Sequence, residues 1–60
     1  MSLNLTANLS DTDGFYEALL TAHDGMTDEE SQAFNARLIL VLANHIGDYD
    51  TLTEALEAAA

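Results

Sequence analysis

The sequence predicts an all-α fold, a three-helix bundle preceded by an extended N-terminal arm. Three stretches repeat apolar residues at helical spacing, capping boxes stand at the start of two of them, and a glycine follows two of them. We expect helices over residues 12–23, 28–46 and 51–59 and a single small domain that spans residues 1–60.

The arm is predicted over residues 1–10. Leu3, Leu5, Ala7 and Leu9 alternate with polar residues, a period of two that is typical of an extended segment with one buried face. Because no second strand follows, this segment cannot form a sheet within one chain. We expect it to lie over the helices, and pairing with a strand of another chain is the alternative.

The first helix begins after a capping aspartate, Asp11 or Asp13. Apolar residues then fall at i, i+4 and i+7 from Phe15, which gives the helix one buried face. Gly25 follows two residues after the predicted end, where a left-handed backbone is expected.

The central helix is apolar around nearly its whole circumference. It begins at a capping box that runs from Thr27 to Glu30 and ends at Gly47, so its length is roughly 28 Å. The third helix begins at Asp50 or at a second capping box, Thr51 to Glu54. Since the outer helices are only roughly 15 to 18 Å long, they leave part of the central helix uncovered. That uncovered strip predicts an association surface.

One narrow polar stripe crosses the central helix. On a helical wheel Glu30, Asn44 and Asp48 lie within about 20° of Arg37. The stripe is either a solvated edge with weak ion pairs, or Arg37 binds a carboxylate of a partner or of this chain. Both interpretations stay open at this stage.

Two other polar residues, Asn35 and His45, interrupt the apolar arc of the same helix. We interpret Asn35 as a helix-packing hydrogen bond and His45 as a last-turn histidine favoured by the helix dipole. A partner contact and a metal ligand are the alternatives for His45. The candidate interface residues are Asn35, Arg37, Leu40, Val41, Asn44, His45 and Asp48.

Composition limits the classes of function. The net charge is −10, with eleven acidic residues and Arg37 as the only lysine or arginine. Nucleic acids and anionic membranes require clustered cations, so neither is an expected partner. The acidic coat keeps a small chain in solution, or it matches a basic protein surface. With no signal peptide and no apolar stretch long enough to cross a membrane, we expect a cytoplasmic protein.

No catalytic apparatus is predicted. The chain has no cysteine, no glycine-rich phosphate loop and no serine in an elbow motif. We therefore expect no enzyme, no cofactor and no metal site within one chain. Sixty residues also leave little volume for a closed pocket.

Three segments resemble a known family. "FYEALL" at 15–20, "ESQAFNARLILVLANHIGD" at 30–48 and "LTEALEAA" at 52–59 resemble very short bacterial helical proteins classed as a domain of unknown function. The resemblance covers about residues 13–59 and implies a small helical protein with no assigned activity or catalytic residues. Proteins of this kind tend to be encoded beside flavin-dependent aromatic hydroxylases and ring-degradation enzymes, which implies an accessory subunit.

The predicted function is a small non-catalytic protein-interaction module. It either self-associates as a homo-oligomer or acts as an accessory subunit of a larger protein, such as a flavin-dependent aromatic-catabolic enzyme. The alternative is a metal- or small-ligand-binding protein whose site is completed at an oligomer interface. In that case His45, Asp48 and Arg37 would contribute to the site.

Overall fold

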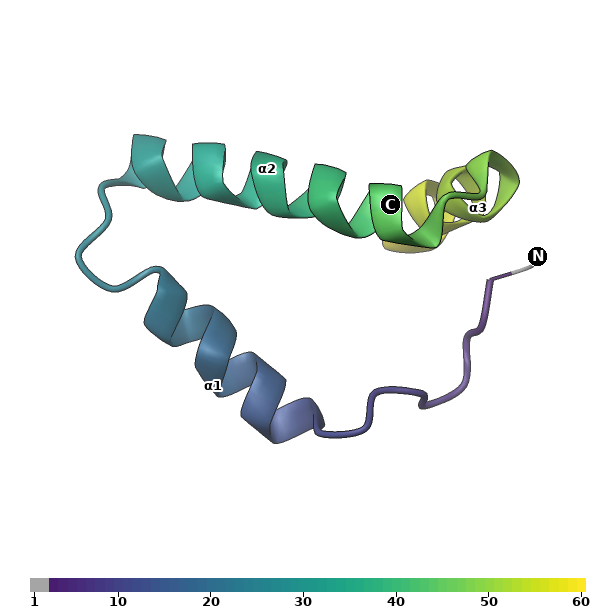
Figure 1. Cartoon of the computed structure of the whole chain (residues 1–60), viewed down its shortest axis with the longest axis horizontal. Coiled ribbons are helices and arrows are strands. Elements are labelled where there is room, and N and C mark those ends of the chain that lie inside the picture. The colour runs from purple at the N-terminus through teal and green to yellow at the C-terminus, as the bar shows by residue number, and fades with distance from the viewer. Residues whose placement is uncertain (1–2) are drawn as a thin grey trace.

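The structure, a computed structural model, describes residues 3–60 and is all-α in that range (Figure 1). Its helices are α1 (Thr12–Ala22), α2 (Asp28–Ile46) and α3 (Tyr49–Ala59). The prediction of an all-α protein with three helices is confirmed. In Figure 1 the long α2 forms one side of the molecule, and α1 and α3 lie at its two ends.

The first two helices begin at caps that the sequence indicates. The Asp11 carboxylate accepts a hydrogen bond from the Gly14 amide at 2.9 Å. The Thr27 hydroxyl accepts from the Glu30 amide at 3.2 Å, and the Glu30 carboxylate accepts from the Thr27 amide at 2.9 Å. This reciprocal pair is the predicted capping box, and it satisfies two amides that the first turn of α2 leaves without intrahelical partners.

The third helix starts slightly earlier than the predicted Asp50 or Thr51. α3 begins at Tyr49, and Asp48 is its N-cap. The Asp48 carboxylate accepts from the Thr51 amide at 2.9 Å and from the Thr51 hydroxyl at 2.5 Å. Gly47 has a positive φ of 76°, a conformation that glycine adopts without steric cost, so α2 ends there and Asp48 caps the next helix.

The end of α1 also differs slightly from the prediction. The helix ends at Ala22, and His23 is its C-cap rather than its last residue. The backbone then turns through Gly25, whose φ is 78°. This left-handed residue lies in the turn between α1 and α2, where the chain reverses, so that α1 lies below α2 in Figure 1.

The N-terminal arm approaches the opposite end of the chain. The Leu3 amide donates a hydrogen bond to the Glu54 carboxylate at 2.9 Å, which attaches the arm to α3. The expected buried face of the arm is not formed in the described residues, because Leu5 is 79% exposed and Leu9 is also exposed. Residues 1 and 2 of the predicted arm lie outside the described residues, and pairing of the arm with another chain stays a prediction.

The three helices form an open arrangement. Among residues 3–60 no apolar side chain is buried, and the one buried residue is Thr51 at the start of α3. A compact protein of 6.5 kDa has about 3,800 Å² of accessible surface, whereas this chain has 5207 Å², an excess of about 1,400 Å². Large apolar side chains of all three helices, such as Leu20, Leu40 and Leu56, are exposed, so the fold presents apolar residues at the surface.

Candidate functional site

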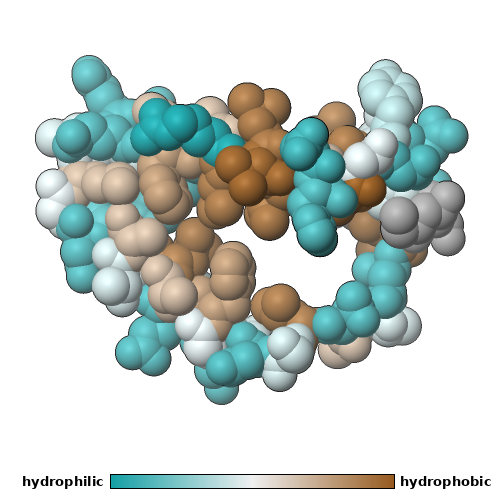
Figure 2. Space-filling model, viewed as in Figure 1, coloured by the Kyte–Doolittle hydropathy of each residue, from teal (hydrophilic) through white to brown (hydrophobic). Residues whose placement is uncertain are grey.

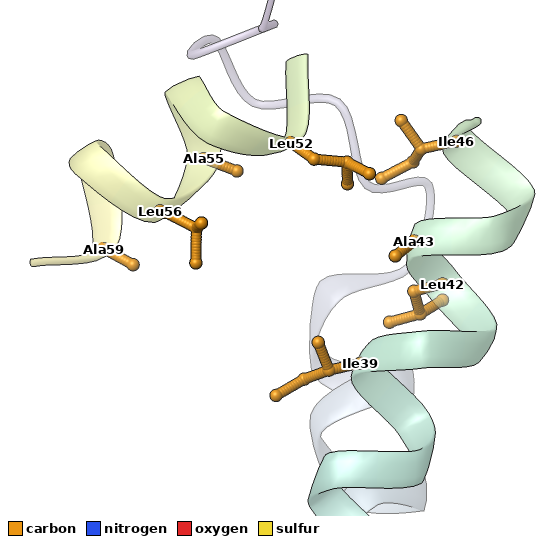
Figure 3. Close-up of a pocket in the computed structure, with 8 residues that line it drawn as sticks. All are labelled: Ile39, Leu42, Ala43, Ile46, Leu52, Ala55, Leu56 and Ala59. Atoms are coloured by element: carbon orange, nitrogen blue, oxygen red, sulfur yellow. The ribbon is translucent and has the colours of Figure 1, made fainter. Parts of the chain in front are cut away.

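The most distinct feature of the surface is an apolar groove between α2 and α3, which we call the α2–α3 groove (Figure 3). Its volume is about 430 Å³. Each helix contributes four residues at positions i, i+3, i+4 and i+7, a spacing that places all four on one face. The groove is lined by Ile39, Leu42, Ala43, Ile46, Leu52, Ala55, Leu56 and Ala59.

The groove is V-shaped. In Figure 3 the two helices converge near Ile46 and Leu52, and they diverge toward Ile39 and Ala59. The convergence follows from the turn at Gly47, which separates the two helices by only two residues. The wide end of the V is therefore open to another molecule.

The lining determines what the groove can bind. All eight side chains are aliphatic, so they supply no hydrogen-bond donor, acceptor, acid, base or nucleophile. Three of them are alanines, whose small side chains allow close approach of another backbone. Leu56 is 72% exposed, so it is available for a contact. The groove is suited to an apolar surface rather than to a reaction.

A second apolar surface lies on the other side of α2. Leu40 is 69% exposed and Val41 is 64% exposed, and both point away from Ile39 because successive residues turn by about 100° around a helix. We call these two residues the outer face of α2. Both were predicted interface residues, and the structure leaves both uncovered. Figure 2 shows apolar side chains along α2 and around the opening in the middle of the molecule.

The predicted polar stripe on α2 does not form as a unit. Arg37 is exposed, and within residues 3–60 it makes no ion pair. The Glu30 carboxylate instead belongs to the capping box. Its hydrogen bond with the Thr27 backbone amide lowers the pKa of Glu30 most, and its interaction with the Thr27 side chain lowers the pKa further. Asn44 and His45 are exposed, and His45 lies in the last turn of α2, where the helix dipole favours a cation.

Asp48 was placed on this stripe from the helical wheel, and the structure corrects that placement. Since α2 ends at Ile46, Asp48 lies outside the helix and caps α3. The hydrogen bond from the Thr51 hydroxyl lowers the pKa of Asp48 most, and the hydrogen bond from the Thr51 amide lowers the pKa further. The aspartate therefore has a structural role in positioning α3 next to α2.

Asn35 forms the connection between α1 and α2. Its side-chain oxygen lies 2.9 Å from Nε2 of His23, and Nδ1 of His23 lies 2.7 Å from the Leu19 carbonyl oxygen. The His23 ring also meets the Phe34 ring edge-on, with 4.9 Å between the ring centroids. The interpretation of Asn35 as a helix-packing residue is confirmed, although its partner His23 was not predicted.

Comparison with known families gives one match. A family model described as "Protein of unknown function (DUF2783)" matches residues 3–60. The chain belongs to this family. The match extends from the arm to the last residue of the chain, so it includes all three helices and the groove of this DUF2783 protein. Neither a curated protein nor a solved structure shows significant similarity to it.

Within residues 3–60, no group of three or more histidine, aspartate or glutamate side chains is arranged to hold a metal ion. In the same range no helix of the DUF2783 protein is long and apolar enough to cross a membrane. The α2–α3 groove and the outer face of α2 are apolar surfaces that residues 3–60 leave uncovered.

Proposed function

We propose that this protein is a small non-catalytic interaction subunit that is completed by another chain. The observation that supports the proposal is the absence of any buried apolar side chain among residues 3–60, in a chain whose helices are nonetheless well capped. Helices of this length are marginal in water without tertiary packing. A partner that covers the apolar surface would supply the missing packing.

The excess surface has the size of an interface. A standard protein–protein interface removes about 800 Å² from each partner, and obligate interfaces remove more. The excess of about 1,400 Å² in this chain is close to one partner's share of an obligate interface. Interfaces of that size are typical of subunits that stay together.

The free energy gained by covering these apolar side chains is also large enough to stabilise the fold. Six large aliphatic side chains on α2 and α3 are between 41% and 72% exposed, and covering them would contribute about 5 to 10 kcal/mol. That contribution is comparable with the whole stability of an ordinary small domain, about 5 to 15 kcal/mol. The side chains are Ile39, Leu40, Val41, Leu42, Ile46 and Leu56.

Two kinds of partner chain would cover this apolar surface. One is a second copy, which makes the protein a homo-oligomer. The other is a larger protein, such as the flavin-dependent aromatic-catabolic enzymes that the family resemblance suggests, which makes this chain an accessory subunit. In both cases the chain contributes binding and packing rather than chemistry.

The mass and the thermal unfolding of the purified chain test this proposal. At micromolar concentration we expect either an oligomer by light scattering, or a monomer whose helicity declines gradually on heating. A monomer that unfolds in one cooperative transition, with the enthalpy of about 40 kcal/mol expected for 60 residues, would overturn the proposal. Circular dichroism gives the transition, and calorimetry gives its enthalpy.

A further inference from the structure

We propose that the α2–α3 groove binds an amphipathic helix of another protein, and that lysine or arginine residues flank the apolar stripe of that helix. This inference rests on the proposed function and names the class of partner. It depends on three observations, namely the shape of the groove, the position of α1 and the charge of the chain.

The groove has the geometry of an incomplete helical bundle. Its two walls carry apolar residues at the same i, i+3, i+4 and i+7 positions, and they diverge from Leu52 toward Ala59 (Figure 3). A third helix with its own apolar stripe fits between two such walls, as in other helix-in-groove complexes. α3 has 11 residues and a length of about 16 Å, so the groove accommodates about three turns of a partner helix.

The chain's own first helix does not occupy the groove. α1 lies at the opposite end of α2 in Figure 1, and the His23–Asn35 hydrogen bond and the edge contact with Phe34 attach it there. Among residues 3–60, the arm is joined to α3 by the hydrogen bond from the Leu3 amide to the Glu54 carboxylate. The groove walls thus remain free for a helix from outside the chain.

Charge distinguishes a foreign helix from a second copy. Each copy carries a net charge of −10 with one cation, so docking two copies would bring twenty net negative charges within one small assembly. The groove lining itself contains no charged residue, and the acidic residues of α3 lie on the face away from the lining. Because these carboxylates lie on the opposite face of α3, cationic side chains that flank a docked stripe would be attracted by the net charge of −10 of the whole chain rather than by direct ion pairs, and acidic ones would be repelled.

Two synthetic peptides test the inference. Each has about 15 residues, long enough to be partly helical in water, and each has leucine at i, i+3, i+4 and i+7. One peptide has lysine on the flanks and the other has glutamate at the same positions. Binding to the isotope-labelled chain is measured by calorimetry and by NMR shift changes of the Ala43, Ala55 and Ala59 amides.

Two variants with nearly equal exposure locate the binding surface. Leu56 in the groove and Leu40 on the outer face of α2 are 72% and 69% exposed, so neither Leu56→Glu nor Leu40→Glu removes a buried side chain. We expect L56E to weaken binding of the lysine peptide at least about tenfold and L40E to change it less than about twofold. Because the added glutamate by itself favours a cationic peptide, a loss in L56E must come from the apolar contact.

The expected result is that the lysine peptide binds at the groove, at least about tenfold more tightly than the glutamate peptide at low salt, and more weakly at high salt. Three results would overturn the inference: no binding of either peptide, equal binding of both, or shift changes outside the groove that L56E leaves intact. A homo-oligomer that buries the groove would overturn it too, while leaving the proposed function standing. A cooperative monomer would instead remove the proposed function.

Discussion

Removal of the hydrogen bond between α1 and α2 should loosen α1 and leave α3 unchanged. The change is Asn35→Ala, which deletes the oxygen 2.9 Å from Nε2 of His23. Because this hydrogen bond is exposed, its net contribution is expected near 1 kcal/mol. His23→Ala removes more, since it also deletes the contact with the Leu19 carbonyl oxygen and the edge contact with Phe34, for a total of about 2 to 3 kcal/mol.

Native-state hydrogen exchange by NMR measures this effect locally. A loss of 1 kcal/mol in the free energy that opens α1 raises the exchange rates of its amides about fivefold, and a loss of 2 kcal/mol raises them about thirtyfold. We expect these increases in residues 12–22 for N35A and H23A respectively, with the amides of α3 unchanged. Asn44→Ala is the matched control, because Asn44 is an exposed asparagine on the same helix and hydrogen-bonds no other side chain within residues 3–60.

The reasoning fails if α1 exchanges at the wild-type rate in both variants. It also fails if α3 accelerates as much as α1, because the His23–Asn35 pair would then support the whole fold rather than the attachment of one helix. A double variant refines the result. If the two side chains act through their mutual contact, adding N35A to H23A should increase exchange less than N35A does alone.

Three further predictions concern the helix termini. The hydrogen bonds from Thr51 lower the pKa of Asp48 below its ordinary value of 3.8, so this cap stabilises α3 above pH 3.8 and the stabilisation is lost as the pH falls through the folded-state pKa. Circular dichroism should therefore show an acid-induced loss of helicity that is smaller in Asp48→Asn, and identical losses would contradict it. Gly47→Ala should cost about 1 kcal/mol in urea unfolding, because the nearest atom to the new Cβ is 3.8 Å away and only the left-handed backbone is strained. An unchanged urea midpoint would refute this. Thr27→Ala should destabilise α2 by about 1 kcal/mol and Thr27→Ser much less, and equal effects of both would show that the hydroxyl is not the cap.

The elements that the sequence predicted well are specified by neighbouring residues. The capping box at Thr27 lies within four consecutive positions, and the end of α2 depends on one glycine. The start of α3 was missed because Asp48 and Thr51 both have the chemistry of a cap. The helical wheel extended α2 past Gly47 and so assigned Asp48 to the wrong helix, whereas the positive φ of Gly47 places it outside.

Features that depend on the angles between helices were predicted less well. The pattern marked Asn35 as a polar residue within an apolar arc, but only the packing of α1 identifies His23 as its partner. The helical wheel likewise placed the Glu30 carboxylate near Arg37. In the structure that carboxylate accepts a hydrogen bond from the Thr27 amide in the capping box instead. The uncovered part of α2 was predicted from helix lengths, and the exposure of Leu40 agrees with it. The α2–α3 groove was not predicted, because its walls come from two helices and no local sequence pattern specifies the angle between them.

The capped helix starts have a consequence for how such a chain would associate. Asp11, Thr27 and Asp48 each define a helix start from residues within the same turn, independently of any partner. A binding surface whose helices are already specified is partly preorganised, so less conformational entropy is lost on association than when a disordered segment folds onto its target. The two turns at Gly25 and Gly47 join the helices and so set the angles between them. A change in those angles on binding would leave the apolar stripe of each helix the same, because each helix start is capped within its own first turn.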